Sequence, residues 1–183
     1  MKIRIPCLAT TVSVLALTLA TPVLAHLMMA GHGTLNIVNN GAFMVLSLPL
    51  SAFEGIDDNG DGEIDLNEFN HHQTEVIRTL SQHVVLRDRE QALPLEDILL
   101  SPGASHDDHG NHHDEISEVT VMGRFALENT RQPLSFQVDL FGKQESARTL
   151  NISASWKSEN LHHEFELTPE QPSGILFPTE NSN

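Results

Sequence analysis

Residues 57–68 read Asp-Asp-Asn-Gly-Asp-Gly-Glu-Ile-Asp-Leu-Asn-Glu, and the function that the sequence predicts rests mainly on this stretch. Side-chain oxygens stand at alternate positions early in the stretch and again near its end, and Gly62 falls where a sharp turn is needed. Calcium accepts about six to eight oxygen ligands at about 2.3–2.6 Å, which this spacing provides, whereas magnesium prefers a tighter octahedron with several waters. The predicted calcium ligands are the side chains of Asp57, Asn59, Asp61, Asp65 and Glu68 and the backbone carbonyl of Glu63.

The residues on both sides of this loop favour helices. Apolar residues recur every three or four positions after the loop, which is the pattern of an amphipathic helix with one buried face. They are Leu66, Phe69, Val76, Ile77 and Leu80. Phe53 and Ile56 precede the loop on what is expected to be one face of a short helix of about two turns. A helix–loop–helix insertion is therefore predicted at about residues 50–82.

With every defined loop position matched, residues 50–80 resemble an EF-hand of the calcium-binding superfamily. The resemblance implies that Ca²⁺ is the bound ion and that Ile64 packs between the ion and the core. An EF-hand normally pairs with a second one. Residues 107–118 match the first and last loop positions, but His112 stands where the turn needs glycine and Ser-Pro-Gly precedes them. We therefore expect the single hand to dock on a sheet.

The N-terminus has the layout of a secretory signal peptide. A short basic start is followed by an apolar run, and small residues end at Ala25. We expect residues 1–25 to be removed and the protein to be periplasmic or secreted. Removal takes away Cys7, the one cysteine in the sequence, so disulfides are not expected to hold the mature chain together. No later segment is long and apolar enough for a membrane span, so none is expected after signal removal.

The chain is acidic, with a formal net charge of −15 at pH 7. This charge argues against nucleic acid or anionic lipid as a partner and suits a protein that binds a cation. The sequence lacks a nucleophile elbow, a phosphate-binding glycine loop and an HExxH motif. We therefore expect a non-enzymatic protein whose ligand is calcium; the sequence indicates no protein partner.

Most of the remaining chain alternates apolar and polar residues with a period of two, which predicts strands with one solvated face. A hairpin is expected around Asn40-Gly41, short strands at 84–86 and 95–100, and four alternating strands between 119 and 167. The predicted fold class is mainly β: an antiparallel β-sandwich-like domain, residues 26–178, that carries the EF-hand insertion. Residues 179–183 are expected to form a disordered tail.

Eleven histidines support an alternative function, that of a periplasmic binder of copper, nickel or zinc. After cleavage, the α-amine and Nδ1 of His26 can chelate copper, with His32, His162 or His163 as a further ligand. Residues 101–115 are expected to form a flexible His/Asp-rich loop, whose histidines lie at 106–113. His71 and His72 occupy adjacent helix positions that point apart, so they are interpreted as surface residues, and His163 is interpreted as a satisfied core histidine.

Residues 26–100 also resemble, more weakly, the extracytoplasmic part of bacterial membrane proteins with hydrogenase and urease accessory functions. The shared features are a signal peptide, a histidine at the mature start, a strand hairpin and an embedded acidic loop. The resemblance implies a connection with metal handling, although this chain has none of the membrane helices of those proteins. A calcium-dependent adhesive or scaffold domain is a third interpretation.

Overall fold

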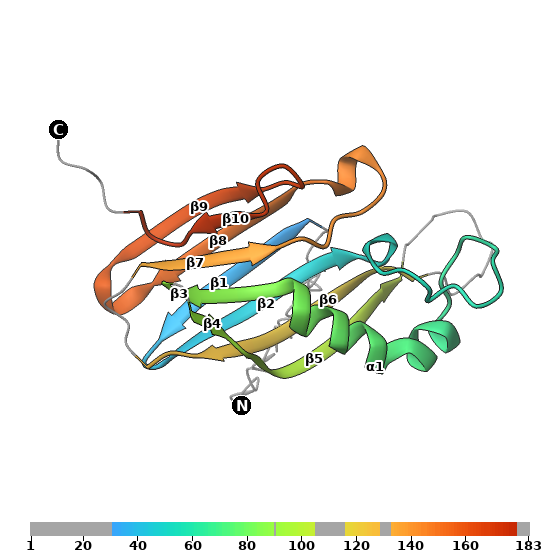
Figure 1. Ribbon diagram of the computed structural model, residues 1–183, viewed down its shortest axis with the longest axis horizontal. Helices are drawn as coiled ribbons and strands as arrows, with labels where there is room; N and C mark the ends of the chain where they lie inside the picture. Colours follow the sequence, from blue (N-terminus) through green and yellow to red (C-terminus); the bar gives the residue numbers. More distant parts are fainter. Residues whose placement is uncertain (1–30, 90, 105–115, 129–132, 179–183) are drawn as a thin grey trace, which may run out of the picture.

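The computed structural model describes residues 31–89, 91–104, 116–128 and 133–178 (Figure 1). The expected signal peptide, His26, the histidines at 106–113 and the tail at 179–183 lie outside the described residues.

Ten strands form two sheets in the described part of the chain, which confirms the mainly β fold class. The larger sheet has the order β5-β6-β2-β1-β8-β9 and the smaller one β10-β7-β3-β4. The larger sheet consists of β1 (His32–Val38), β2 (Gly41–Pro49), β5 (Leu95–Ala104), β6 (Ile116–Ala126), β8 (Leu150–Trp156) and β9 (Leu161–Leu167). The smaller sheet consists of β3 (Val84–Asp88), β4 (Gln91–Leu93), β7 (Leu134–Val138) and β10 (Ser173–Ile175).

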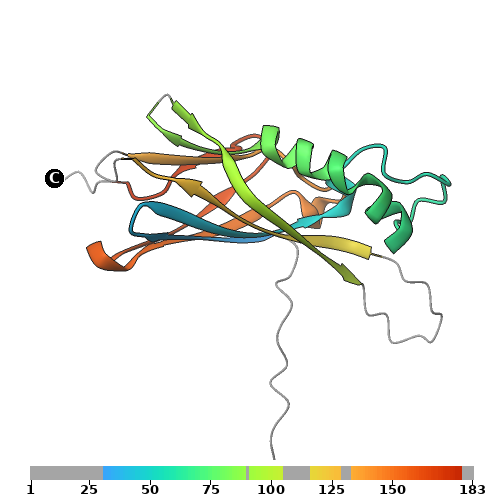
Figure 2. The same cartoon turned by 90° about the horizontal axis from the view of Figure 1, so that it is seen from below.

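The two sheets share one hydrophobic core, and Figure 2 shows them as separate layers. Leu46 and Phe125 of the larger sheet and Leu86 and Phe136 of the smaller sheet are fully buried. The rings of Phe125 and Phe136 meet edge to face across the layers, with centroids 6.4 Å apart. Aromatic pairs prefer this geometry, so the contact joins the sheets at the centre of the core.

The predicted hairpin forms: β1 and β2 pair antiparallel, and Asn39 takes a left-handed conformation with φ of 53° in the turn. The prediction of purely antiparallel sheets is wrong at one place. Strands β1 and β8 lie parallel, with Leu35 opposite Ala154. A parallel pair needs a long crossover between its strands, and the chain between β1 and β8 contains all the elements from β2 to the 3₁₀ helix η2 (Glu145–Ala147).

The predicted helix after the loop forms as α1 (Leu66–His83). Phe69, Val76 and Leu80 are buried in the common core, so this helix docks on the sheets as expected. Leu66 does not belong to the buried face; its first-turn position leaves it 46 % exposed. Helix α1 passes directly into β3 at Val84, which fixes its direction relative to the smaller sheet (Figure 1).

The short helix expected before the loop does not form. Leu50–Ala52 make one turn of 3₁₀ helix, η1, and bends follow up to the loop. Pro49 is extended, and Gly55 has φ of 72°, so neither end of this segment continues a helix. Leu50, Phe53 and Ile56 are nevertheless all buried. Their spacing of three residues satisfies the core without an α-helix.

No described helix is long and apolar enough to cross a membrane. A third 3₁₀ turn, η3 (Lys157–Glu159), connects β8 to β9.

Candidate metal centre

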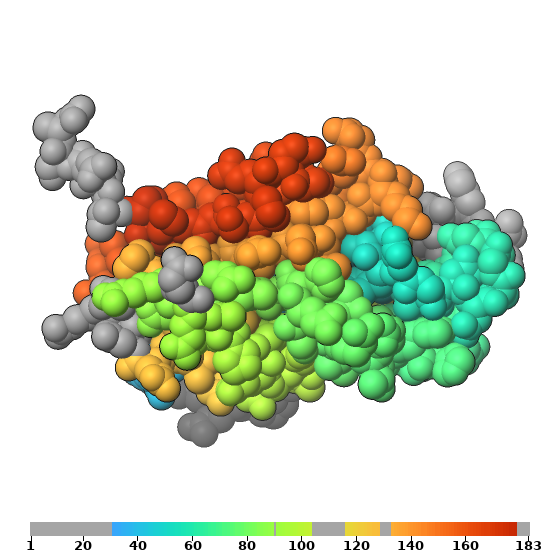
Figure 3. Space-filling view, in the orientation of Figure 1, coloured from blue at the N-terminus to red at the C-terminus, as the bar shows by residue number. Residues whose placement is uncertain are grey.

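The loop of residues 57–65 lies at one end of the elongated molecule, between η1 and the first turn of α1 (Figure 1). Figure 3 shows the loop and the start of α1 as one projecting end of the surface. Residues 58–63 are exposed, whereas Ile56 just before them and Phe69 just after them are buried. The loop is therefore held at both ends by the core.

The turn of the loop depends on two glycines in the left-handed region, Gly60 with φ of 75° and Gly62 with φ of 88°. Both of their backbone N–H groups donate to the carboxylate of Asp57: Gly60 N to Oδ1 at 2.6 Å and Gly62 N to Oδ2 at 3.0 Å. The first carboxylate of the loop is thus pointed toward the inside of the turn.

Two further side chains continue this pattern along the loop. Asn59 Oδ1 accepts a hydrogen bond from Asp61 N at 2.8 Å, and Asp61 Oδ1 accepts one from Glu63 N at 2.9 Å. Short Asn and Asp side chains commonly bond to the backbone two residues ahead, which fixes the turn. Each oxygen has more than one lone pair, so these bonds leave capacity for a cation.

Glu68 closes the loop from the first turn of α1. It is only 7 % exposed, and both of its carboxylate oxygens reach back to the loop. Oε1 accepts hydrogen bonds from Asp58 N at 3.0 Å and from Asn59 N at 3.3 Å, and Oε2 accepts one from Asp65 N at 3.0 Å. Buried carboxylates need such partners, and here the partners tie the last loop position to the first ones.

Asp65 caps the N-terminus of α1. Its Oδ1 accepts from Asn67 N at 2.7 Å and from Glu68 N at 2.9 Å, and together with Glu68 it completes a capping box. Negative charge at this end of a helix is also favoured by the helix dipole.

The centre of the loop is bonded to the larger sheet. Ile116 N, at the start of β6, donates to the carbonyl oxygen of Ile64 at 2.8 Å. Ile64 is partly buried and packs against the common core. Strand β6 therefore contacts the apolar position of the loop.

The carboxylate oxygens of the loop are not gathered as closely as the ligand atoms of a three-residue cluster at the same end of the molecule. Among the described His, Cys, Asp and Glu side chains, Asp58, His71 and His72 bring their ligand atoms within 4.8 Å of one another, and Asp57, Asp61, Asp65 and Glu68 form no such group. Each of these four carboxylates is instead turned toward backbone N–H groups. Of the four residues only Asp61 is exposed; Asp57 and Asp65 are half-buried and Glu68 is buried.

The cluster of Asp58, His71 and His72 corrects the interpretation of the two histidines. Both rings reach the same carboxylate: His71 Nδ1 lies 2.9 Å from Oδ2 and His72 Nε2 lies 2.8 Å from Oδ1. The hydrogen bond from His71, and then that from His72, lowers the pKa of Asp58 below its usual value. Adjacent helix positions do point apart, but one ring uses its near nitrogen and the other its far nitrogen, so both reach Asp58.

The other histidine candidates are not brought together in the described region. His32 pairs with Asn151 of β8, whereas His163 pairs with Ala154, three residues further along that strand. Three residues of strand span about 10 Å. His32 Nδ1 is buried without a hydrogen-bond partner among the described residues, and His162 is exposed.

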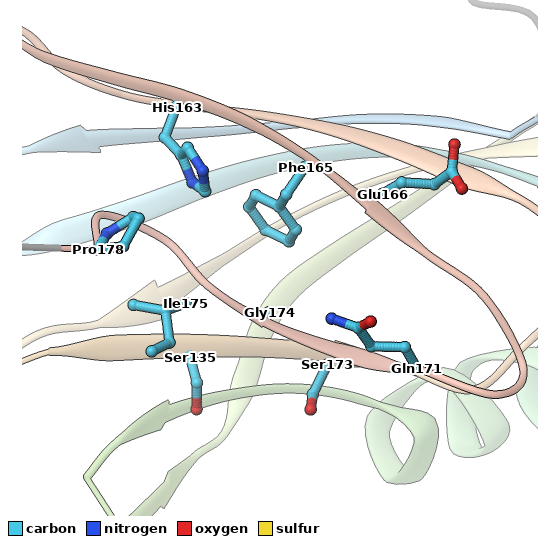
Figure 4. Close-up of a pocket in the computed structure, with 9 residues that line it drawn as sticks. All are labelled: Ser135, His163, Phe165, Glu166, Gln171, Ser173, Gly174, Ile175 and Pro178. Atoms are coloured by element: carbon cyan, nitrogen blue, oxygen red, sulfur yellow. The ribbon is translucent and has the colours of Figure 1, made fainter. Parts of the chain in front are cut away.

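A hollow lies between β9 and β10, with Ser135 of β7 at its edge (Figure 4). His163 Nδ1 lies 3.0 Å from the carbonyl oxygen of Leu176, and its ring stacks on Phe165 with centroids 5.4 Å apart. Phe165 also lies against Gly174, where an added Cβ would come within 2.6 Å of the ring. His163 is half-buried with a satisfied nitrogen, as expected, and its contacts are those of packing between the sheets.

A comparison with models of known protein families finds none that matches this chain, and a comparison with curated proteins likewise finds no match.

Proposed function

We propose that this chain is an exported, non-enzymatic calcium-binding protein that holds one Ca²⁺ ion with residues 57–68. In this proposal the loop and α1 correspond to the second half of an EF-hand, and η1 with the following bends replaces the first helix. The ligands are the oxygens of Asp57, Asn59, Asp61, Asp65 and Glu68 and the carbonyl of Glu63.

The observation that carries this proposal is the position of Glu68. The last ligand of such a loop must approach the first ones, although ten residues lie between positions 57 and 68 in the sequence. Glu68 meets this requirement, because its Oε1 accepts hydrogen bonds from Asp58 N and Asn59 N. A carboxylate that is 7 % exposed and bonded only through backbone N–H groups also leaves its negative charge available to a cation.

The chemistry of the donors favours calcium over other ions. Every proposed ligand atom is an oxygen, and hard cations prefer oxygen. Magnesium would demand a tighter octahedron and retain several waters, whereas the exposed residues 58–61 can adjust to the larger and more variable calcium shell.

We infer a mainly structural role for the ion. Calcium would connect the loop, the capped start of α1 and, through the Ile116–Ile64 hydrogen bond, the larger sheet. Extracellular calcium modules bind with dissociation constants of about 10⁻⁴–10⁻³ M, so the site would be filled constantly outside the cell and would not serve as a cytosolic sensor.

Isothermal titration of the mature protein with Ca²⁺ tests the proposal. Glu68→Gln removes the bidentate ligand and should abolish most of the binding, together with the gain in thermal stability that calcium produces. Glu63→Gln is the matched control: it makes the same charge change at an exposed loop position whose side chain is not a proposed ligand, and it should retain the binding. Unchanged calcium affinity in Glu68→Gln would reject the proposal.

A further inference from the structure

We propose that Asp58, His71 and His72 form a second metal site, separate from the calcium loop, that takes a transition-metal ion of the Zn²⁺, Ni²⁺ or Cu²⁺ class. The site does not use any of the proposed calcium ligands. It also differs from the sites that the sequence indicates at His26 and in residues 101–115, and it does not depend on calcium binding.

The three side chains come from two elements that the fold holds together. Asp58 lies in the loop, and His71 and His72 lie on α1, one turn after Glu68. Asp58 is held in place by its own backbone, because its N–H donates to Glu68 Oε1 at 3.0 Å. The histidine rings lie with centroids 4.8 Å apart and planes tilted by 50°, so each ring presents one nitrogen to the same carboxylate.

The set of donors selects the class of ion. Two imidazole nitrogens and one carboxylate oxygen suit zinc, nickel and copper, whereas calcium and magnesium prefer oxygen alone. Three protein ligands leave at least one coordination position for water, as in zinc sites that are not purely structural.

The distances require only a small rearrangement. Zinc bonds of about 2.0–2.1 Å at tetrahedral angles place the ligand atoms about 3.3 Å apart. The two contacts to Asp58 are 2.9 and 2.8 Å and must therefore lengthen by roughly half an ångström, after which the ion lies among the three atoms. His71 is 72 % exposed and Asp58 46 %, so both side chains can rotate, while His72 at 21 % is the more fixed ligand.

Binding also requires a defined protonation of each ring. A metal ligand must offer a lone pair, so His71 must carry its proton on Nε2 and His72 on Nδ1. The ion then takes the place of the protons that the two rings share with Asp58.

The test is a titration of the full mature chain with Zn²⁺ alone, followed by long-range ¹H–¹⁵N spectra of the histidine rings. One equivalent of zinc should shift the Nδ1 resonance of His71 and the Nε2 resonance of His72. His72→Ala and Asp58→Asn should each lose that equivalent, or bind it at least about tenfold more weakly. His162→Ala is the matched control, because His162 lies 3.4 Å from a single carboxylate, that of Glu164, and is 61 % exposed.

Zinc-induced shifts confined to other histidines, or a stoichiometry that neither variant changes, would overturn the proposal. The spectra of the unaltered protein identify the histidine nitrogens that bind zinc, even if one of the variants folds poorly. The same titration in Glu68→Gln separates the two sites: zinc binding that depends on His72 and survives the loss of calcium binding supports the second site irrespective of the first.

Discussion

At the scale of single residues, the sequence identifies the oxygen donors of the loop and the glycine of its turn, because those positions are adjacent in the chain. Gly62 has the positive φ expected of it, and Asp57 accepts its N–H. The cluster at Asp58 could not be predicted. This cluster depends on how far the side chains of His71 and His72 extend and on which ring nitrogen of each contacts Asp58. Neither can be read from the spacing of residues in the sequence.

Gly62→Ala should weaken calcium binding by about 5- to 30-fold. No atom lies within 4 Å of an added Cβ at Gly62, so the substitution adds only the strain of a left-handed backbone, about 1–2 kcal/mol. Gly55→Ala is the matched control, with φ of 72° and equally open space outside the ligand set. It should lower stability to a similar extent and leave calcium affinity close to that of the unaltered protein. Equal calcium affinities in the two variants, measured by titration, would contradict this role of Gly62.

At the scale of elements, apolar residues at helical spacing predict α1 well, and the structure adds a capping box of Asp65 and Glu68 at its start. The short helix before the loop is wrongly predicted. Apolar residues three apart suit a 3₁₀ turn with bends as well as they suit an α-helix, and Pro49 and Gly55 bound the segment. Periodicity over so few residues does not separate these possibilities.

We expect Asp65 to have two separable roles, one as the N-cap of α1 and one as a calcium ligand. Asp65→Asn keeps a good N-cap acceptor for Asn67 N and Glu68 N, so stability without calcium should change little while calcium affinity falls. Asp65→Ala loses both roles, so it should also lower the free energy of unfolding by about 0.5–2 kcal/mol relative to the unaltered protein. Chemical denaturation in a calcium chelator, combined with calcium titration, measures the two effects separately. A calcium-free stability of Asp65→Asn as low as that of Asp65→Ala would contradict the capping role.

At the scale of the whole molecule, alternation predicts a β-rich domain with two solvated outer faces, and the two sheets with one shared core agree with it. The parallel pairing of β1 with β8 could not be predicted, because it joins segments more than a hundred residues apart and no local turn specifies it. The docking of the loop on β6 is equally non-local, since it depends on one hydrogen bond between Ile116 and Ile64.

Calcium should stabilise the start of β6 more than the opposite end of the larger sheet. The amide of Ile116 donates to the loop at 2.8 Å, so its hydrogen exchange should slow when calcium is added. The amide of Leu127 is the internal control, because it donates to Asn40 O, also at 2.8 Å, beyond the other end of the same strand. Equal slowing at both amides, measured by NMR, would mean that calcium stabilises the sheet only globally.

A crystal structure of the mature protein grown with Ca²⁺ would show whether residues 57–68 enclose one calcium ion. Anomalous scattering should place one calcium within the loop, with oxygens of Asp57, Asn59, Asp61, Asp65 and Glu68 and the carbonyl of Glu63 at about 2.3–2.6 Å. A map without an anomalous peak in the loop, with the carboxylates of Asp57, Asp61 and Glu68 facing different directions, would contradict calcium binding by this loop.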